Sequence, residues 1–345
     1  MPRSKWRCSI RRRRAEPPAV LPFTSIDKRT AGFEELSYAM NLIHIRNVIA
    51  IVERGSLRSA SRQLGIAQPA LTRSVRDLEQ ELGAELFERA RAGMTVTPIG
   101  ELFYRRAKGI EAEIKRTLDE IEQIKGRDMG MVTVGLSTAA HLELLPKILG
   151  PFRRRFPTIR LKILEGLFPS FEADIRDGHI DLYYGPVKKD FTDPGLIVEA
   201  LFQNPRIIIA RSGHPLSGAT SIVELAGAQW VTTPVMIDST YEVNAMFTEA
   251  GLPPPHIAVE ATSGLSIITA VLSTDLLAPM PGQWRKVIEA TPFIEQIPIR
   301  EATYAPRICA VRPARMPMTP AAEYLNDLIL RAAPHVAAAT APPPP

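Results

Sequence analysis

Four polar side chains in the stretch from Gln68 to Leu82 have types and spacing that suit contact with DNA. Glutamine can donate to and accept from adenine, arginine can donate to guanine or phosphate, and threonine offers a hydroxyl and a methyl group. These side chains share one face of a predicted helix and are Gln68, Thr72, Arg73 and Arg76. An ordinary solvated helix face has the same composition. The neighbouring elements must therefore decide between the two interpretations.

The stretch that carries these residues is predicted to be an amphipathic helix. Its apolar residues recur at steps of three and four, and are Leu71, Val75, Leu78 and Leu82. Pro69 lies in the first turn, where its missing N–H is harmless, and Gly83 follows the last apolar residue as a stop. The polar set therefore lies opposite the buried stripe.

Two further helices are predicted immediately before it. Helical spacing runs from Leu42 to Val52, and Ser56 is then a suitable N-cap for a shorter helix that ends at Gly65. A helix, a short helix, a tight glycine turn and a polar-faced helix together make a helix-turn-helix. In that motif the second helix enters the major groove while the first lies across the backbone.

A hairpin is predicted after the third helix, because residues 86–89 and 94–97 alternate like two short strands around a turn at 91–93. Such a wing brings its arginines to the adjacent groove or to phosphates. The full predicted DNA-binding set is Ser56, Arg58, Gln68, Pro69, Thr72, Arg73, Arg76, Arg89 and Arg91.

Residues 98–127 form a predicted linker helix with one apolar seam. The proposed dimerisation residues of this seam are Phe103, Ala107, Ile110, Ile114, Leu118 and Ile121. A long helix with a single apolar seam and charged flanks pairs with a second copy of itself. The alternative is that the seam packs onto its own chain.

From about residue 129 to 333, strand and helix patterns alternate, which predicts a mostly parallel sheet covered on both faces. In such sheets ligands bind beyond the carboxyl ends of strands. Serine and threonine residues lie in turns at the ends of predicted strands or at the starts of predicted helices. They are Ser137 and Thr138, Thr232 and Thr233, and Thr262 and Ser263. We expect them to bind a small carboxylate or sulfonate, the alternative being simple helix capping. Pro186, Phe202 and Met280 are expected to line an apolar wall suited to an aromatic ligand.

Composition excludes several other classes of protein. The chain has 345 residues, 45% hydrophobic and 23% charged, which is long and apolar enough for more than one domain. Two cysteines, Cys8 and Cys309, exclude a disulfide framework or thiolate zinc site, and the histidines have no metal-ligand spacing. No apolar run is long enough for a membrane span, and no catalytic constellation is present. We therefore expect a cytoplasmic protein that is not an enzyme, with no metal and no cofactor.

Both ends of the chain depart from this globular composition. Residues 1–39 carry nine basic and four acidic residues, which accounts for the whole net charge of +5, and they have no sustained periodicity. They are expected to be a disordered basic extension. Residues 334–345 are a proline-rich tail with little to bury.

Short motifs spread over residues 40–100 identify a family. They are Gly55-Ser56, Gln68-Pro69-Ala70-Leu71, Leu78-Glu79, Leu82-Gly83, Leu86-Phe87-Glu88-Arg89 and Thr97-Pro98-Ile99-Gly100. Residues 40–97 thereby resemble the winged DNA-binding domain of LysR-type transcriptional regulators. Two positions depart from the family pattern. Ala67 replaces the usual capping Ser or Thr, which costs the helix about 0.5–2 kcal/mol, and Ser61 replaces an alanine.

Looser motifs extend the resemblance to the second half: Leu145-Pro146 with Phe156-Pro157, Asp177-Gly178 with Asp181, and Thr319-Pro320-Ala321. This half is similar to the effector-binding domain of the same family, which in turn is similar to periplasmic binding proteins. The resemblance implies an α/β domain of two lobes. We expect one lobe at about 129–195 with 305–333, and the other at about 196–304.

The expected function is a sequence-specific DNA-binding transcriptional regulator modulated by an anionic effector. Its expected partners are double-stranded DNA, a second copy of itself in a dimer or tetramer, and the effector, with RNA polymerase as a further candidate. The rival hypothesis is a small-molecule binding protein whose helical front end only dimerises. A salt titration of DNA affinity separates the two.

Overall fold

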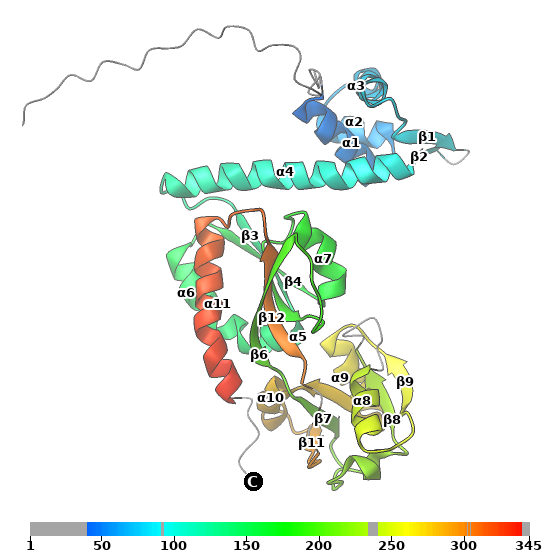
Figure 1. The fold of residues 1–345 in the computed structure, drawn as a ribbon, viewed down its shortest axis with the longest axis vertical. Coiled ribbons are helices and arrows are strands. Elements are labelled where there is room, and N and C mark those ends of the chain that lie inside the picture. The colour runs from blue at the N-terminus through cyan, green and yellow to red at the C-terminus, as the bar shows by residue number, and fades with distance from the viewer. Residues whose placement is uncertain (1–39, 91–92, 234–240, 302, 304, 340–345) are drawn as a thin grey trace, which may run out of the picture. The chain divides into compact units, whose positions relative to one another are not determined.

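The computed structural model describes residues 40–90, 93–233, 241–301, 303 and 305–339. Its first part contains three helices and a hairpin: α1 (Leu42–Arg54), α2 (Leu57–Leu64), α3 (Gln68–Leu82), β1 (Phe87–Ala90) and β2 (Gly93–Val96) (Figure 1). The strands pair antiparallel, with Phe87 opposite Val96. The predicted winged helix-turn-helix is therefore confirmed as a fold.

The core of this winged domain is formed by the apolar stripes of its helices. Val48 of α1, Ala60 of α2, and Leu71 and Leu78 of α3 are buried together with Leu86. The periodicity thus correctly predicts the buried face of each helix, except at the helix ends, where Leu42 and Leu82 are 57% and 37% exposed. The departure at residue 61 is accommodated, since the buried Ser61 hydroxyl donates to the carbonyl of Arg58 at 3.0 Å.

Helix caps in this domain follow the sequence. Asn41, Ser56 and Thr97 accept hydrogen bonds from backbone N–H groups in the first turns of α1, α2 and α4. The N-cap of α3 is Ala67, and no side chain caps that helix. The helix that presents the polar face therefore has the least satisfied start of the four.

The long helix α4 (Pro98–Ile124) follows the hairpin and begins against it. Thr97 donates from its backbone to the carbonyl of Leu86 at 3.0 Å and from its hydroxyl to the carbonyl of Glu85 at 2.7 Å. A Cβ on Gly100 would lie 2.1 Å from the Leu86 carbonyl oxygen. Only glycine fits there, which explains the Thr-Pro-Ile-Gly motif physically.

The first lobe of the α/β region is a five-stranded sheet in the order β4-β3-β5-β12-β6. Its strands are β3 (Met131–Leu136), β4 (Arg160–Glu165), β5 (Leu182–Pro186), β6 (Leu196–Gln203) and β12 (Arg307–Pro313). Its helices are α5 (Thr138–Glu143), α6 (Leu145–Arg155), α7 (Phe168–Arg176) and α11 (Pro320–Ala339).

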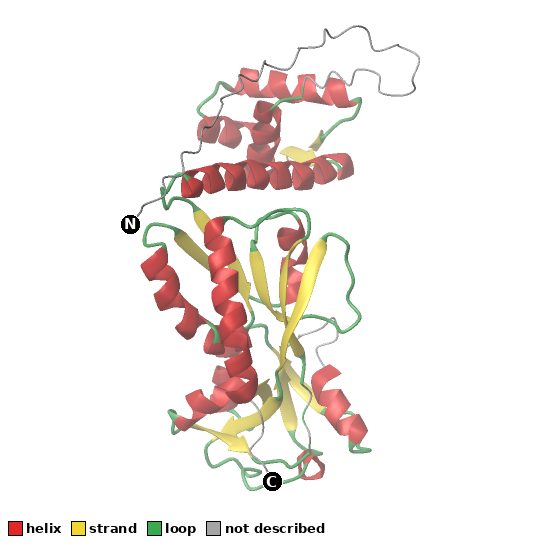
Figure 2. Ribbon diagram, turned by 60° about the vertical axis from the view of Figure 1, so that its left-hand side comes forward, coloured by secondary structure: helices red, strands yellow, loops and turns green. Residues whose placement is uncertain are grey.

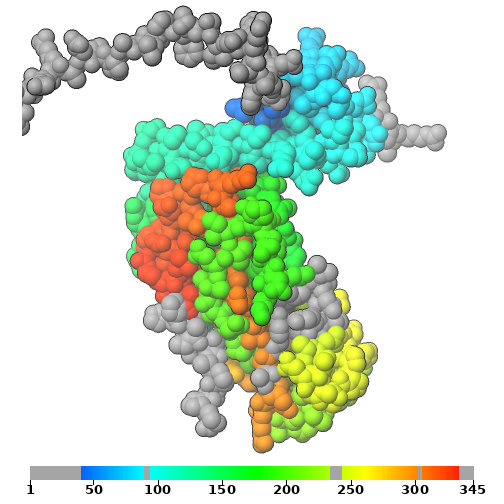
Figure 3. Space-filling model, in the orientation of Figure 1, coloured from blue at the N-terminus to red at the C-terminus, as the bar shows by residue number. Residues whose placement is uncertain are grey.

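Helices cover both faces of this sheet. Residues of α5, α6 and α11 share one core with Val134, Leu182 and Ile308, while α7 packs on the opposite face against Tyr183 and Val311. Helices α6 and α11 run side by side (Figure 2), and α11 forms part of the outer surface (orange to red in Figure 3).

The second lobe contains β7 (Arg206–Arg211), β8 (Gln229–Thr232), β9 (His256–Glu260), β10 (Ala278–Pro281) and β11 (Ile294–Ile297). Strand β7 lies between β10 and β11, and a single bridge from Trp230 to Leu277 connects this sheet to the β8–β9 pair. The helices of this lobe are η1 (Ile222–Leu225), α8 (Tyr241–Glu249), α9 (Gly264–Ser273), η2 (Gly282–Trp284) and α10 (Arg285–Glu289).

Four expectations need correction. Helix α11 continues to Ala339, so residues 334–339, which were expected to belong to the proline-rich tail, are helical. Strand β6 pairs with β12 in the first lobe, so the chain crosses to the second lobe after Gln203 and not at 196. The first-lobe sheet is half antiparallel, because β12 runs against both β5 and β6, and β7 is antiparallel to both of its neighbours. Strand β11 lies at Ile294–Ile297, where the sequence pattern predicts no strand.

Two crossings join the lobes and are tied together by backbone hydrogen bonds. The Asn204 N–H donates to the Pro306 carbonyl, and the Gly282 N–H donates to the Pro205 carbonyl, each at 3.0 Å. The hydroxyl of Thr303 donates to the carbonyl of Arg206 at 2.6 Å. The segment 204–206 is therefore held on both sides where the lobes meet.

None of the helices in the described ranges is long and apolar enough to cross a bilayer.

Candidate functional site

The polar face of α3 is presented outward, as predicted. Gln68, Pro69, Arg73 and Arg76 are exposed, opposite the buried Leu71 and Val75. Thr72 is half-buried, and its hydroxyl donates to the Gln68 carbonyl at 3.0 Å. Because that proton is used within the helix, Thr72 offers its methyl group and oxygen lone pairs.

Two hydrogen-bond systems position this helix and the hairpin after it. The buried amide of Asn47 on α1 donates to the hydroxyl of Ser74 on α3 at 2.8 Å. One carboxylate oxygen of Glu79 accepts from the backbone N–H groups of Leu86 and Phe87 at 2.8 and 3.1 Å. Glu79 therefore links the end of the polar-faced helix to the start of the wing.

The remaining predicted DNA contacts differ in how far the structure describes them. Arg58 is exposed on α2, and Ser56 caps that helix by accepting from the Ser59 N–H at 3.2 Å. The side chain of Arg89 and the whole of Arg91 lie outside the described part of the chain.

The structure divides the predicted seam of α4 into two parts. Phe103 and Ala107 pack on Ile45 and Ile49 of α1, so they are used within the same chain and are not free for a partner. Ile110, Leu118 and Ile121 are exposed, at 41%, 59% and 41%, and Ile114 is half-buried. The winged domain thus takes the first turns of the seam and leaves the rest uncovered in the single chain.

A buried arginine connects α4 to the first lobe. Arg116 donates to the Gly178 carbonyl at 2.8 Å and to the Asp181 carboxylate at 3.0 Å. The other oxygen of Asp181 accepts from the Thr133 N–H at 2.7 Å. Burial raises the pKa of Asp181, and the Arg116 charge and the Thr133 N–H oppose this rise. The motif Asp177-Gly178 with Asp181 thus forms a docking point for the linker helix.

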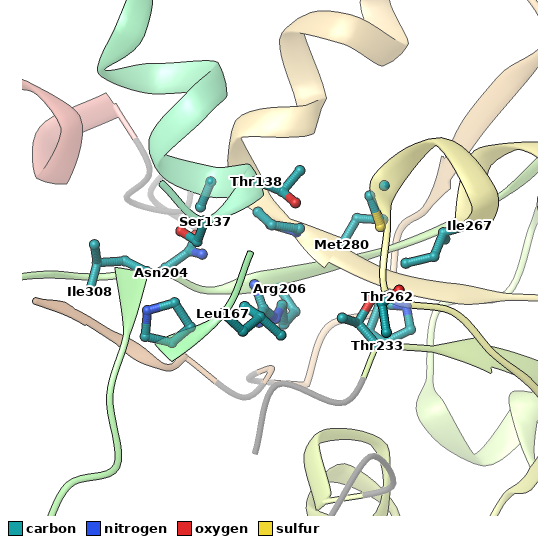
Figure 4. Close-up of a pocket in the computed structure, with 15 residues that line it drawn as sticks. Ser137, Thr138, Leu167, Asn204, Arg206, Thr233, Thr262, Ile267, Met280 and Ile308 are labelled. Carbon is teal, nitrogen blue, oxygen red and sulfur yellow. The ribbon is translucent and has the colours of Figure 1, made fainter. Parts of the chain in front are cut away.

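A cavity lies between the two lobes, with about 530 Å³ of empty space when its open side is included. Six of the nine predicted effector-binding residues line it. They are Ser137, Thr138, Pro186, Thr233, Thr262 and Met280 (Figure 4). The strand ends identified from the sequence therefore do meet at one cleft.

Three predicted residues lie elsewhere. Phe202 is buried in the core of the first lobe, because it points into the layer under α6 and α11. Thr232 is 2% exposed and points away from the cleft, since neighbouring strand residues face opposite sides. Ser263 caps α9 by accepting from the Ser266 N–H at 3.1 Å. For Ser263 the capping alternative describes its role.

The two hydroxyls of the first lobe have partners within the protein. Ser137 accepts from the Ala140 N–H at 3.4 Å as the cap of α5, and Thr138 donates to the Glu165 carboxylate at 3.2 Å. Helix α5 contains six residues, so its contribution to anion binding is small. These residues shape one wall of the cleft.

Two polar cleft residues were not foreseen from the sequence. Asn204 and Arg206 line the cavity and are 0% and 7% exposed. Both amide atoms of Asn204 are without a hydrogen-bond partner among the described residues. A buried polar group left unpaired costs about 1–3 kcal/mol, so such a group needs an explanation. The available signal was a pair of polar residues around Pro205 between two apolar strands.

Comparison with known proteins assigns both halves of the chain. Residues 42–101 match the family model described as bacterial regulatory helix-turn-helix protein, lysR family. Residues 125–334 match the model described as LysR substrate binding domain. The second match alone covers more than half of the 345 residues.

Individual relatives agree with these matches. The HTH-type transcriptional regulator TdcA of Escherichia coli (strain K12) is 27% identical over 278 residues, covering 81% of this chain and 88% of TdcA. The HTH-type transcriptional regulator BenM of Acinetobacter baylyi is 29% identical over 251 residues, covering 67% of this chain and 81% of BenM. The crystal structure of CbnR, a LysR family transcriptional regulator, has a TM-score of 0.66 at 19% identity, covering 85% of this chain and 99% of CbnR.

Proposed function

The chain belongs to the LysR family of DNA-binding transcriptional regulators, and we propose that a small carboxylate or sulfonate in its interlobe cleft controls how paired copies read DNA. The observation that carries the effector part is the cleft itself. It contains the cationic side chain of Arg206, the amide of Asn204 and the hydroxyls of Thr233 and Thr262, beside apolar walls. Cationic and hydrogen-bonding groups of this kind bind oxyanions.

The DNA-reading face in this proposal is the exposed side of α3. Gln68, Arg73 and Arg76 have the chemistry for base edges and phosphates, and Asn47 and Glu79 hold the helix and wing in place. Exposure of these side chains supports the assignment, because a side chain that reads a base must reach beyond the protein surface. Ser56, Arg58, Arg89 and Arg91 are assigned to phosphates and the adjacent groove.

Pairing is assigned to the uncovered part of the α4 seam. Ile110, Leu118 and Ile121 expose large apolar side chains on a helix whose polar flanks are charged. Burying them against a second copy removes this apolar surface from water, which favours association. The two recognition helices of a dimer are then expected to meet half-sites about 34 Å apart, or a multiple of that distance.

Control by the effector requires that it binds one arrangement of the lobes better than another. The cleft lies at the two crossings, so a ligand there contacts both lobes at once. The Arg116–Asp181 pair is one contact that would pass a change in the first lobe to the linker helix, and the Gln123 side chain, which accepts from the Ala321 N–H, is another. The coupling is reciprocal, so DNA binding would change effector affinity by the same factor.

The test of the reading face uses the full chain and DNA that flanks its own gene. We expect Arg73→Ala and Arg76→Ala each to weaken binding by about 1–3 kcal/mol. If the replaced residue contacts a phosphate, the salt dependence of DNA affinity should also fall by about one released ion. If it reads a base, its replacement should instead relax the sequence preference.

Arg154→Ala is the matched control, because Arg154 is exposed on α6 and its removal changes the net charge equally. If the α3 variants bind as tightly as this control, the reading face is wrong. If the unaltered chain binds no DNA at low salt, the rival of a dimeric small-molecule binding protein takes its place.

A further inference from the structure

We propose that Asn204 selects the effector of this cleft, and that the ligand it selects is an α-hydroxy carboxylate. The proposal rests on the function proposed above, since it deepens the chemistry of the same cleft. It is carried by an amide that is fully buried, lines the cavity and has neither its Nδ2 nor its Oδ1 satisfied among the described residues.

The backbone around Asn204 holds the side chain in place. Its own N–H donates to Pro306 on the second crossing, and the carbonyl of the following Pro205 accepts from Gly282 in the second lobe, each at 3.0 Å. The backbone from which the side chain projects is therefore fixed, and because the side chain is fully buried its packing limits the rotamers open to the amide. An amide held in this way is already oriented before a ligand arrives, which lowers the entropy lost on binding.

Asn204 lies in the cavity where a ligand would contact both the first and the second lobe. In Figure 4, Asn204, Ser137 and Ile308 lie on one side of the cavity, and Thr233, Thr262 and Ile267 lie on the other. A ligand that reaches Asn204 is thus contacted by the first lobe at one end and by the second lobe at the other. Selection at Asn204 and a change in the lobes can follow from one binding event.

The chemistry of an amide limits what can satisfy it. Nδ2 donates and Oδ1 accepts, side by side in one plane, so the complementary ligand presents an acceptor next to a donor. A plain carboxylate satisfies Nδ2 but places a second anionic oxygen near Oδ1, where two acceptors repel. An α-hydroxy carboxylate offers one carboxylate oxygen to Nδ2 and its hydroxyl proton to Oδ1. Both atoms of Asn204 are then paired.

Two other features of the cavity distinguish between related ligands. An α-amino acid also carries a donor beside its carboxylate, but moving its ammonium charge from water into a buried site costs far more free energy than moving a neutral hydroxyl. The hydroxyl is therefore favoured over the ammonium group. Leu167, Ile267 and Met280 supply apolar surface for the rest of the ligand.

The experiment is calorimetric titration of the full-length protein with two matched sets of acids. The small set is lactate, propionate and alanine, and the aromatic set is mandelate, phenylacetate and phenylglycine. Within at least one set we expect the hydroxy acid to bind about 10- to 100-fold more tightly than its unsubstituted partner, as for a hydrogen bond made in a buried charged site. We expect the amino acid to bind more weakly than the hydroxy acid.

Variants assign this preference to Asn204. In Asn204→Leu the hydroxy acid and its parent acid should bind with the same affinity, whereas Gln203→Leu, an exposed neighbour that does not line the cavity, should keep the preference. Thermal unfolding of Asn204→Leu should occur at the same or a higher temperature, because the change removes a buried amide without a partner. Asn204→Asp keeps the side-chain shape, and its negative charge should weaken the binding of the hydroxy acid and the parent acid in both sets.

The proposal is overturned if the hydroxy and parent acids bind equally to the unaltered chain, if an amino acid binds best, or if none of the six binds. It is equally overturned if Asn204→Leu keeps the preference, or if it loses stability while ligand affinity is unchanged. DNA binding is measured on the same preparation. A chain that binds DNA but shows no hydroxyl preference refutes the role of Asn204 and leaves the regulator function intact.

Discussion

Replacing Glu79 by alanine is expected to loosen the wing without unfolding the helix that carries it. The Glu79 carboxylate is half-buried and accepts from two consecutive backbone N–H groups, those of Leu86 and Phe87. Hydrogen bonds to a charged group contribute about 1.5–3 kcal/mol each. The lower value applies at a half-buried site, so Glu79→Ala is expected to lose about 3 kcal/mol at the start of the hairpin.

A graded variant separates charge from geometry. Glu79→Gln keeps one carbonyl acceptor at the same position, and neutral hydrogen bonds are about half as strong as charged ones. Its expected loss is therefore about 1–1.5 kcal/mol. Glu85→Ala removes the same charge from an exposed neighbour whose side chain has no hydrogen bond in the described structure, so it is the matched control.

Amide hydrogen exchange of the full chain is the appropriate assay, because global unfolding of a multidomain protein is not two-state. A loss of about 3 kcal/mol corresponds to exchange roughly 150-fold faster in the peptide that holds Leu86 and Phe87. In the same peptide, exchange should be roughly tenfold faster in Glu79→Gln and should be unchanged in Glu85→Ala. Equal exchange in Glu79→Ala and Glu85→Ala would refute the assignment of Glu79 as the link between α3 and the wing.

Three further predictions concern packing, charge and assembly. Gly100→Ala should lower the unfolding temperature, because its Cβ would lie 2.1 Å from a carbonyl oxygen; in Gly109→Ala the nearest atom is 3.6 Å away, so that variant should be at least as stable as the parent. Arg116→Met should destabilise the chain by about 3–5 kcal/mol near neutral pH. This loss of stability should shrink as pH falls through the raised pKa of Asp181, because the carboxyl then becomes neutral and no longer needs the arginine as a partner. A loss of stability in urea unfolding that is the same at every pH would contradict this. Leu118→Glu should shift sedimentation to a smaller species without lowering stability, since the side chain is 59% exposed, and an unchanged assembly would place the pairing elsewhere.

The helices of the winged domain could be predicted from the sequence because their signals are local. Ser56, Pro69 and Gly83 mark ends within a few residues of the apolar stripes that they bound, and each stripe faces the core. Helix α9, at Gly264–Ser273, has the same kind of local signal, because Ser263 caps an apolar run. Caps and apolar periodicity depend on residues only three or four positions apart, so a single sequence is enough to identify them.

The lobe assignment of β6 could not be read in this way. Its alternation is the same whichever sheet it joins, and its partner β12 lies about a hundred residues further along, with Val198 opposite Val311. Strand β11 has only four residues, between Pro292 and Pro298, so its two isoleucines gave too short a pattern. Pairing partners far apart in sequence leave no local trace.

The cleft was half predictable for a related reason. Hydroxyl residues at strand ends could be located, but which of Thr232 and Thr233 faces the cavity depends on the strand's register in the sheet. Asn204 belongs to a crossing with no periodicity, and its significance is visible only as a buried amide without a partner. That property arises only when the chain is folded.

The missing cap at Ala67 has a consequence for motion. Three helices of the winged domain and linker begin with a side-chain cap, and α3, which carries the polar face, does not. Its first turn should therefore open locally more often than those of α1, α2 and α4 in the free protein. A DNA phosphate placed at that turn would supply the absent acceptor and quench the opening. Part of the free energy of DNA binding would then be used to order Gln68, so the first turn of α3 would be less ordered in the free protein than in the complex with DNA.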